Sequence, residues 1–121
     1  MTKEQMLQRT KTFALRVIKA VQALRKRDDV AVILGRQLLR SGTSVGANYR
    51  AACRAKSTAD FIHKLKIVEE ECDESLYWME LLVESEAIPA ARFHALMREA
   101  DELISIVVAA LRTTRAHSLK S

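Results

Sequence analysis

Apolar residues recur along the chain at steps of three and four, which is the spacing of one face of an α-helix. In the first segment this stripe contains Met6, Phe13, Val17, Ala20 or Val21, and Leu24, with one seven-residue step between Met6 and Phe13. Similar stripes follow in three later segments. The pattern therefore predicts four helices, at about 3–25, 30–55, 58–85 and 89–113, and a frayed tail at 114–121.

Signals for helix starts lie where two of these stripes begin. Ser57 is a candidate N-cap with an acid three residues on, Asp60, which is a variant of the capping box. Pro89 suits the first turn of a helix, where its missing N–H is not needed. Long helices with short connections predict a single domain over residues 1–121, an all-α, up-down-up-down antiparallel four-helix bundle.

The stretch RSGTSVGANYR at 40–50 is poor material for the interior of a helix, yet the apolar phase runs through it unbroken. Gly42 and Gly46 each cost roughly 0.5–1 kcal/mol relative to alanine. We expect their missing side chains to let a neighbouring helix approach closely. We also expect Asn48 to hydrogen-bond across the bundle, because an unpaired buried amide is costly. The predicted packing positions are Ser41, Gly42, Gly46 and Asn48.

The last two predicted helices carry more apolar residues than one bundle core requires. A generous core in a small bundle would account for them, but so wide an apolar arc usually contacts another protein. We expect self-association into a homo-oligomer. The predicted subunit contact consists of Ile62, Tyr77, Trp78, Leu81, Ile104, Val108 and Leu111.

Charge is distributed unevenly along the chain. Residues 1–66 hold 15 Lys/Arg and 4 Asp/Glu, a net +11, whereas residues 67–121 hold 5 and 11, a net −6. The basic half could bind a polyanion, or it could pair with the acidic half within or between subunits. Arginine forks suit phosphate groups, and the arginines of the second helix share one side. The candidate nucleic-acid-binding residues are Arg9, Arg16, Lys19, Arg36, Arg40, Arg50 and Arg54.

No aromatic residues are interleaved with these cations, so base stacking is not indicated. Residue patterns that would indicate a metal site or a catalytic site are also weak. The single Asp-x-x-His, Asp60 with His63, does not match the two Glu-x-x-His pairs of a di-iron bundle. Cys53 and Cys72 lack a Cys-x-x-Cys spacing, and Cys72 falls in the core stripe. The acidic run at 69–74 is typical of a solvated or ion-paired helix face. We therefore expect no enzyme activity, no metal and no cofactor.

Targeting signals are also absent from the pattern. No apolar run approaches the length of a membrane span, and MTKEQMLQRT lacks the apolar stretch of a signal peptide. Two cysteines are too few for a secreted disulfide framework. The expected location is the cytoplasm.

The run 40–50 resembles the signature of a bacterial family called four helix bundle protein, also known as the protein encoded in intervening sequences of large-subunit ribosomal RNA genes. The likeness continues through 54–57 and 60–65, and again through Glu70 and 73–82, so that it covers about half the chain. One departure is Ala51, where the family pattern usually has a glutamate after Asn-Tyr-Arg.

The resemblance implies a compact four-helix bundle that assembles as a ring-like homopentamer. It also implies similarity to the accessory proteins of diversity-generating retroelements, which bind nucleic acid and partner a reverse transcriptase. It implies no enzyme. We thus expect a non-enzymatic oligomer that binds RNA or DNA non-specifically through its basic surface. The alternative is a structural or protein–protein interaction module that does not bind nucleic acid.

Overall fold

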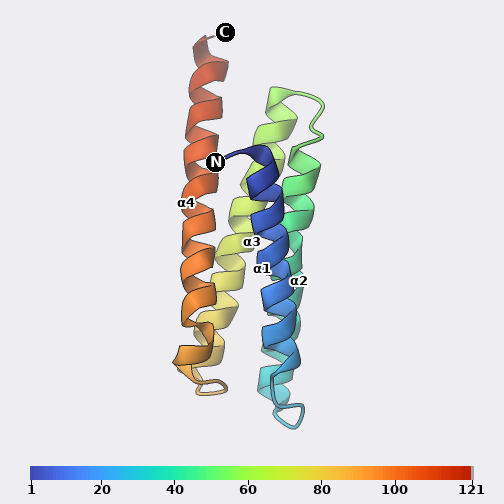
Figure 1. The fold of residues 1–121 in the computed structure, drawn as a ribbon, viewed down its shortest axis with the longest axis vertical. Helices are drawn as coiled ribbons and strands as arrows, with labels where there is room; N and C mark the ends of the chain where they lie inside the picture. Colours follow the sequence, from blue (N-terminus) through green and yellow to red (C-terminus); the bar gives the residue numbers. More distant parts are fainter. Residues whose placement is uncertain (121) are drawn as a thin grey trace.

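The computed structural model describes residues 1–120, which form four α-helices and no strand. The helices are α1 (Lys3–Gln22), α2 (Asp29–Ala52), α3 (Thr58–Glu84) and α4 (Ala90–Lys120). They lie side by side, and each connection turns the chain back along the long axis (Figure 1). The prediction of an all-α chain with four helices is confirmed.

Short polar side chains begin the first three helices. Thr2 and Gln5 form a reciprocal capping box on α1, and the Asp28 carboxylate accepts a hydrogen bond from the backbone N–H of Ala31 at the start of α2. Ser57 caps α3 as predicted, because its hydroxyl accepts from the backbone N–H of Asp60. The Asp60 carboxylate accepts from the backbone of Lys56, one residue before the cap, so the capping box is shifted.

Helix α4 is longer than the sequence predicted. It continues to Lys120, whereas a frayed tail was expected from residue 114; Ser121 lies outside the described residues. No glycine or proline follows Pro89 to stop the helix. The hydroxyls of Thr113 and Thr114 donate to carbonyls four residues earlier, and basic residues near its end suit the helix dipole. Figure 1 shows the end of α4 extending past the other helices.

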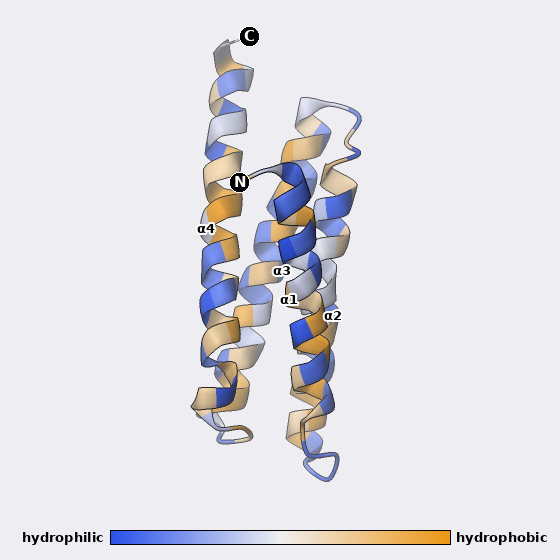
Figure 2. Cartoon of the chain, in the orientation of Figure 1, coloured by the Kyte–Doolittle hydropathy of each residue, from blue (hydrophilic) through white to orange (hydrophobic). Residues whose placement is uncertain are grey.

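One hydrophobic cluster is shared by all four helices. Apolar and polar segments alternate along each helix in Figure 2, as expected when one face of every helix is buried. Leu111 belongs to this cluster, with only 2% of its surface exposed. Its assignment to the subunit contact is therefore wrong: the side chain fills the interior of its own chain.

Thr10 occupies the seven-residue step in the α1 stripe. It is fully buried, and its hydroxyl donates to the backbone carbonyl of Met6 at 3.0 Å, which satisfies the polar group inside the core. A stripe traced through apolar residues alone passes over this position.

Helix α1 approaches α2 closely at the glycines of α2, which have no side chain to keep the two helices apart. A Cβ atom placed on Gly42 would lie 2.8 Å from Cγ1 of Val17, and one on Gly46 would lie 3.3 Å from the carbonyl oxygen of Thr10. Gly35 similarly faces Leu24, at 2.6 Å. All three glycines of the chain thus lie on the α1 side of α2, and the close packing offsets their poor helix propensity.

A pair of serines joins α2 to α3. The hydroxyl oxygens of Ser41 and Ser75 lie 2.9 Å apart, both fully buried. Asn48, expected to bond across the bundle, instead donates to the backbone carbonyl of Ser44 in its own helix at 2.8 Å. The expectation was wrong because Asn48 is only half-buried and has a carbonyl within reach one turn back.

The fit at Gly42 predicts that Gly42→Ala destabilises the protein by about 1–2 kcal/mol, although alanine is the better helix former. Val17 cannot yield easily, because it is fully buried and its branched side chain has one favoured rotamer in a helix. Urea unfolding would measure the loss. In a Val17→Ala background the same change should cost clearly less. An unchanged or raised unfolding midpoint in the parent background would contradict the close-packing account.

Cys72 lies in the core, where the sequence placed it, with its thiol 3.3 Å from the carbonyl oxygen of Ala100. Burial raises the pKa of this thiol from its ordinary 9.0 to about 12. Because the unfolded chain releases this proton first as the pH rises, the thiol stabilises the fold fully below pH 9 and loses that contribution between pH 9 and about 12.

Denaturant unfolding at pH 8 and pH 10.5 should therefore show a loss of stability to which Cys72 contributes about 2 kcal/mol. Cys72→Ala, although less stable at both pH values, should lose less between them. Cys53→Ala removes the half-buried cysteine and serves as the control, which should lose stability as the parent chain does. Equal alkaline losses in the parent and Cys72→Ala would refute the assignment.

Candidate nucleic-acid interface

Arg9 is held in an ion pair between α1 and α4. Its Nε and Nη2 atoms donate to the two carboxylate oxygens of Glu99 at 2.8 and 2.7 Å, and Nη2 also lies 2.8 Å from Glu102. The side chains of Arg9 and Glu99 are only 22% and 17% exposed. The hydrogen bonds from the two glutamates raise the pKa of Arg9 above its already high value. Arg9, predicted to contact nucleic acid, is therefore already paired with carboxylates of its own chain.

Arg40 makes a similar bridge between α2 and α3. Its guanidinium pairs with Glu71 at 3.3 Å and also with Glu74. Partial burial raises the pKa of Glu71, and the charge of Arg40 acts against that rise. Two carboxylates of the acidic run on α3 therefore neutralise Arg40 on the basic side of α2.

The other five predicted residues are exposed and form no ion pair with any residue among 1–120. They do not share one surface. Arg16 follows Arg9 after two helical turns and so lies on the α4 side of α1, and Lys19 lies about half a turn around α1 from Val17, which faces α2. The residues that remain on α2 and just beyond it are Arg36, Arg50 and Arg54.

A hollow of about 580 Å³ lies between α1 and α2, and we call it the α1–α2 groove. Its lining includes Gly46 and Thr10, whose backbone lies close against that glycine. Four cations line it and only one carboxylate, Glu4. The four cations are Lys3, Lys11, Arg50 and Arg54.

Lys3 and Lys11 were missed by the sequence reasoning, which took Arg9, Arg16 and Lys19 as the α1 contribution. The two lysines are eight residues apart, so they lie about 80° from each other around α1 and both line the groove. Finding them requires knowing which side of α1 faces α2. That is set by the contacts of Gly42 and Gly46 with α1.

A second cavity of about 440 Å³ adjoins the groove at the end of α1. Lys3 and Cys53 line both spaces, so the two hollows are neighbours. The cavity also contains the rings of Tyr49 and Phe61. Burial, reinforced by the neighbouring Cys53, raises the pKa of the Tyr49 phenol to about 12, so this group adds no negative charge at neutral pH.

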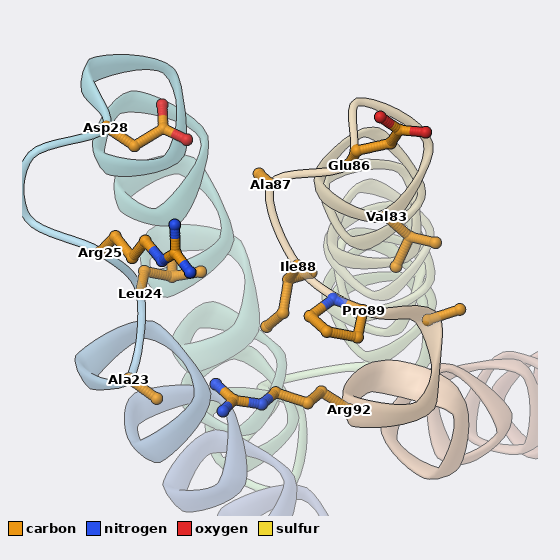
Figure 3. Close-up of a pocket in the computed structure, with 11 residues that line it drawn as sticks. Ala23, Leu24, Arg25, Asp28, Val83, Glu86, Ala87, Ile88, Pro89 and Arg92 are labelled. Carbon is orange, nitrogen blue, oxygen red and sulfur yellow. The ribbon is translucent and has the colours of Figure 1, made fainter.

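A third hollow, of about 610 Å³, lies at the opposite end, between the α1–α2 and α3–α4 connections. Figure 3 shows Arg25 and Arg92 reaching into it from different elements, with two acidic residues, Asp28 and Glu86, on its border. Cations and carboxylates are therefore balanced here, and the Asp28 carboxylate is used as a helix cap. The α1–α2 groove is the stronger candidate for an anionic ligand.

The predicted subunit contact is partly exposed. Tyr77 is 52% exposed and packs edge-on against Trp78 with ring centroids 5.3 Å apart. Trp78 is half-buried, and its indole N–H donates to Glu74 at 3.2 Å. The remaining members apart from Leu111 are half-buried: Ile62, Leu81, Ile104 and Val108. Sequence reasoning missed five more exposed apolar residues, which are Met1, Leu15, Val30, Ile33 and Leu119.

Within residues 1–120, no group of three or more His, Cys, Asp or Glu side chains is placed to hold a metal ion. No helix in the same range is long and apolar enough to cross a membrane.

The sequence and fold were compared with known proteins. Residues 2–109 match the family model described as 23S rRNA-intervening sequence protein. Among solved structures, the chain is similar to a protein of unknown function from the S23 ribosomal protein family of Bacteroides thetaiotaomicron. The two share 32% identity over 93% of this chain and 99% of that one, with a TM-score of 0.85. No curated protein matches the chain.

Proposed function

The chain belongs to the 23S rRNA-intervening sequence protein family, and from this premise we propose that it is a non-enzymatic protein that binds RNA or DNA non-specifically through the α1–α2 groove. The observation that carries the proposal is the set of four cations around the groove, none of which is paired with a carboxylate among the described residues. These are Lys3, Lys11, Arg50 and Arg54.

The geometry suits a phosphate backbone. Lys3 and Lys11 are eight residues apart, which is about 12 Å along α1 at 1.5 Å per residue. That distance corresponds to about three or four nucleotides of one strand at 3.4 Å each. The two arginines provide planar forks that can donate two hydrogen bonds to one phosphate. One copy of the chain would therefore make about four phosphate contacts, which gives weak, salt-dependent binding.

Assembly would strengthen this binding. We further propose that the chain is an up-down-up-down antiparallel bundle forming a ring-like homo-oligomer, a pentamer by resemblance, through exposed apolar residues of α3 and α4. Tyr77, Leu81 and Val108 support it, because each keeps apolar surface outside the core of its own chain. Several grooves on one particle would raise the avidity without new contacts.

Binding to a fluorescent 20-base-pair duplex and to a single strand of the same length should be detectable by anisotropy at 50 mM salt and fall steeply at 200 mM. Arg50→Gln and Arg54→Gln should each weaken binding at low salt and reduce the salt slope by about 1, since each removes a phosphate contact.

Arg40→Gln is the matched control on the same helix. Its guanidinium already pairs with Glu71 and Glu74, so this change should leave the salt slope nearly unaltered. Absence of binding at low salt, or equal effects of the Arg40 and Arg50 changes, would refute the groove. In the first case the structural module without nucleic-acid binding becomes the better description. The pairing of Arg9 and Arg40 with acidic residues of other helices supports that alternative.

Light scattering after gel filtration should give a mass well above the 13.7 kDa of one chain, and about 69 kDa for five copies of 13.7 kDa. Leu81→Glu should lower this mass by placing a charge in the apolar contact. Ile33→Glu is the control, because Ile33 on α2 is exposed but lies outside the proposed contact. A monomeric parent chain, or equal effects of the two changes, would contradict the assembly.

A further inference from the structure

We infer that the preferred ligand is a single strand, held with its phosphates in the α1–α2 groove and one base inserted into the adjoining cavity beside Tyr49 and Phe61. The inference rests on the proposed function and adds to it the strandedness of the ligand. A stacking role was not indicated by the sequence, because no aromatic residues are interleaved with the basic stripe. The fold supplies the two rings from α2 and α3 instead.

The groove and the cavity share part of their lining. Lys3 and Cys53 line both, so a strand whose backbone follows the four cations would pass beside the cavity at Lys3. At about 440 Å³ the cavity has the size of a small-ligand pocket and is large enough for a nucleobase.

The chemistry of the cavity suits a base rather than a second phosphate. Tyr49 and Phe61 are half-buried against the core, which fixes their rings while leaving part of each accessible. Lys3 is the one charged residue among those lining the cavity. The Tyr49 phenol stays protonated at neutral pH, so this group adds no negative charge beside an incoming strand.

A positively charged groove with aromatic rings beside it is the arrangement that proteins use for single strands. A base paired in a duplex cannot enter the cavity without being unpaired and unstacked, which costs free energy that a single strand does not lose. Every base has a flat face, so the site needs no particular sequence.

The test compares three fluorescein-labelled ligands on the unmodified full chain at low salt. They are a twelve-nucleotide dT strand, an abasic strand of the same length and charge, and a twelve-base-pair dA·dT duplex. Base insertion predicts that the dT strand binds at least about fivefold more tightly than the abasic strand, and also more tightly than the duplex. Equal affinities for the dT and abasic strands, or tighter binding of the duplex, would overturn the inference and leave the proposed function intact.

A variant that fills the cavity gives an independent test. Ala55 lines the cavity, so Ala55→Met should weaken binding of the dT strand by at least about fivefold while leaving binding of the abasic strand unchanged. Ala59→Met is the matched control, since Ala59 is exposed near the start of α3 and lines neither space. Circular dichroism would verify that both variants fold. The comparison of the dT and abasic strands on the unmodified chain does not depend on either variant.

If Ala55→Met weakens both strands equally, or Ala59→Met acts like it, the cavity is not the base site and the inference fails. If none of the three ligands binds the parent chain, the proposed function fails together with it. Loss of dT binding confined to Ala55→Met supports base insertion.

Discussion

The close approach of α1 to α2 is the constraint on which the rest of the structure depends. It is possible because α2 presents Gly35, Gly42 and Gly46 to its neighbour, so that Val17 and the backbone of Thr10 rest almost directly on the α2 backbone. The contact fixes the rotation of α1 about its axis. That rotation turns Lys3 and Lys11 toward Arg50 and Arg54, and it turns Arg9 away from them toward α4. One packing contact therefore determines both the hydrophobic interior and the arrangement of surface charge.

The basic residues divide into two classes by their surroundings. Arg9 and Arg40 are matched with glutamates of α4 and α3 and hold neighbouring helices together. Lys3, Lys11, Arg50 and Arg54 surround a hollow with a single acid. Some cations of the strongly basic first half of the chain therefore hold helices together, and others remain available around the groove. The total charge does not tell these two classes apart; the positions of nearby acidic side chains do.

The sequence predicted most of the fold because helical periodicity, capping residues and the scarcity of turn formers all indicated the same four elements. The errors come from interactions that periodicity does not encode. Asn48 donates a hydrogen bond to a backbone carbonyl of its own helix, and Ser41 of α2 is hydrogen-bonded to Ser75 of α3. Leu111 was assigned to the surface contact, yet it follows Leu103 and Val107 at four-residue steps and packs in the core with them.

The candidate site was less predictable than the fold. Arg50 and Arg54 were identified from their shared side of α2, but Lys3 and Lys11 depend on the rotation of α1, which a single helix pattern does not give. The aromatic cavity depends on all four helices and the connection after α2 coming together, so that Tyr49, Phe61 and Thr114 meet around one space. Such tertiary neighbours are separated by up to 65 positions in the sequence (from 49 to 114).

The overhang of α4 has a consequence for how its sequence is constrained. The last residue that α4 contributes to the core is Leu111, and the family match ends at 109, yet the helix runs on to Lys120. Residues 112–120 contain three Lys/Arg and no Asp/Glu. Apart from Thr114, which is half-buried and lines the aromatic cavity, residues 112–119 are exposed, so packing places little constraint on their identity. The extension can therefore change in length and charge between relatives while the architecture beneath it stays the same.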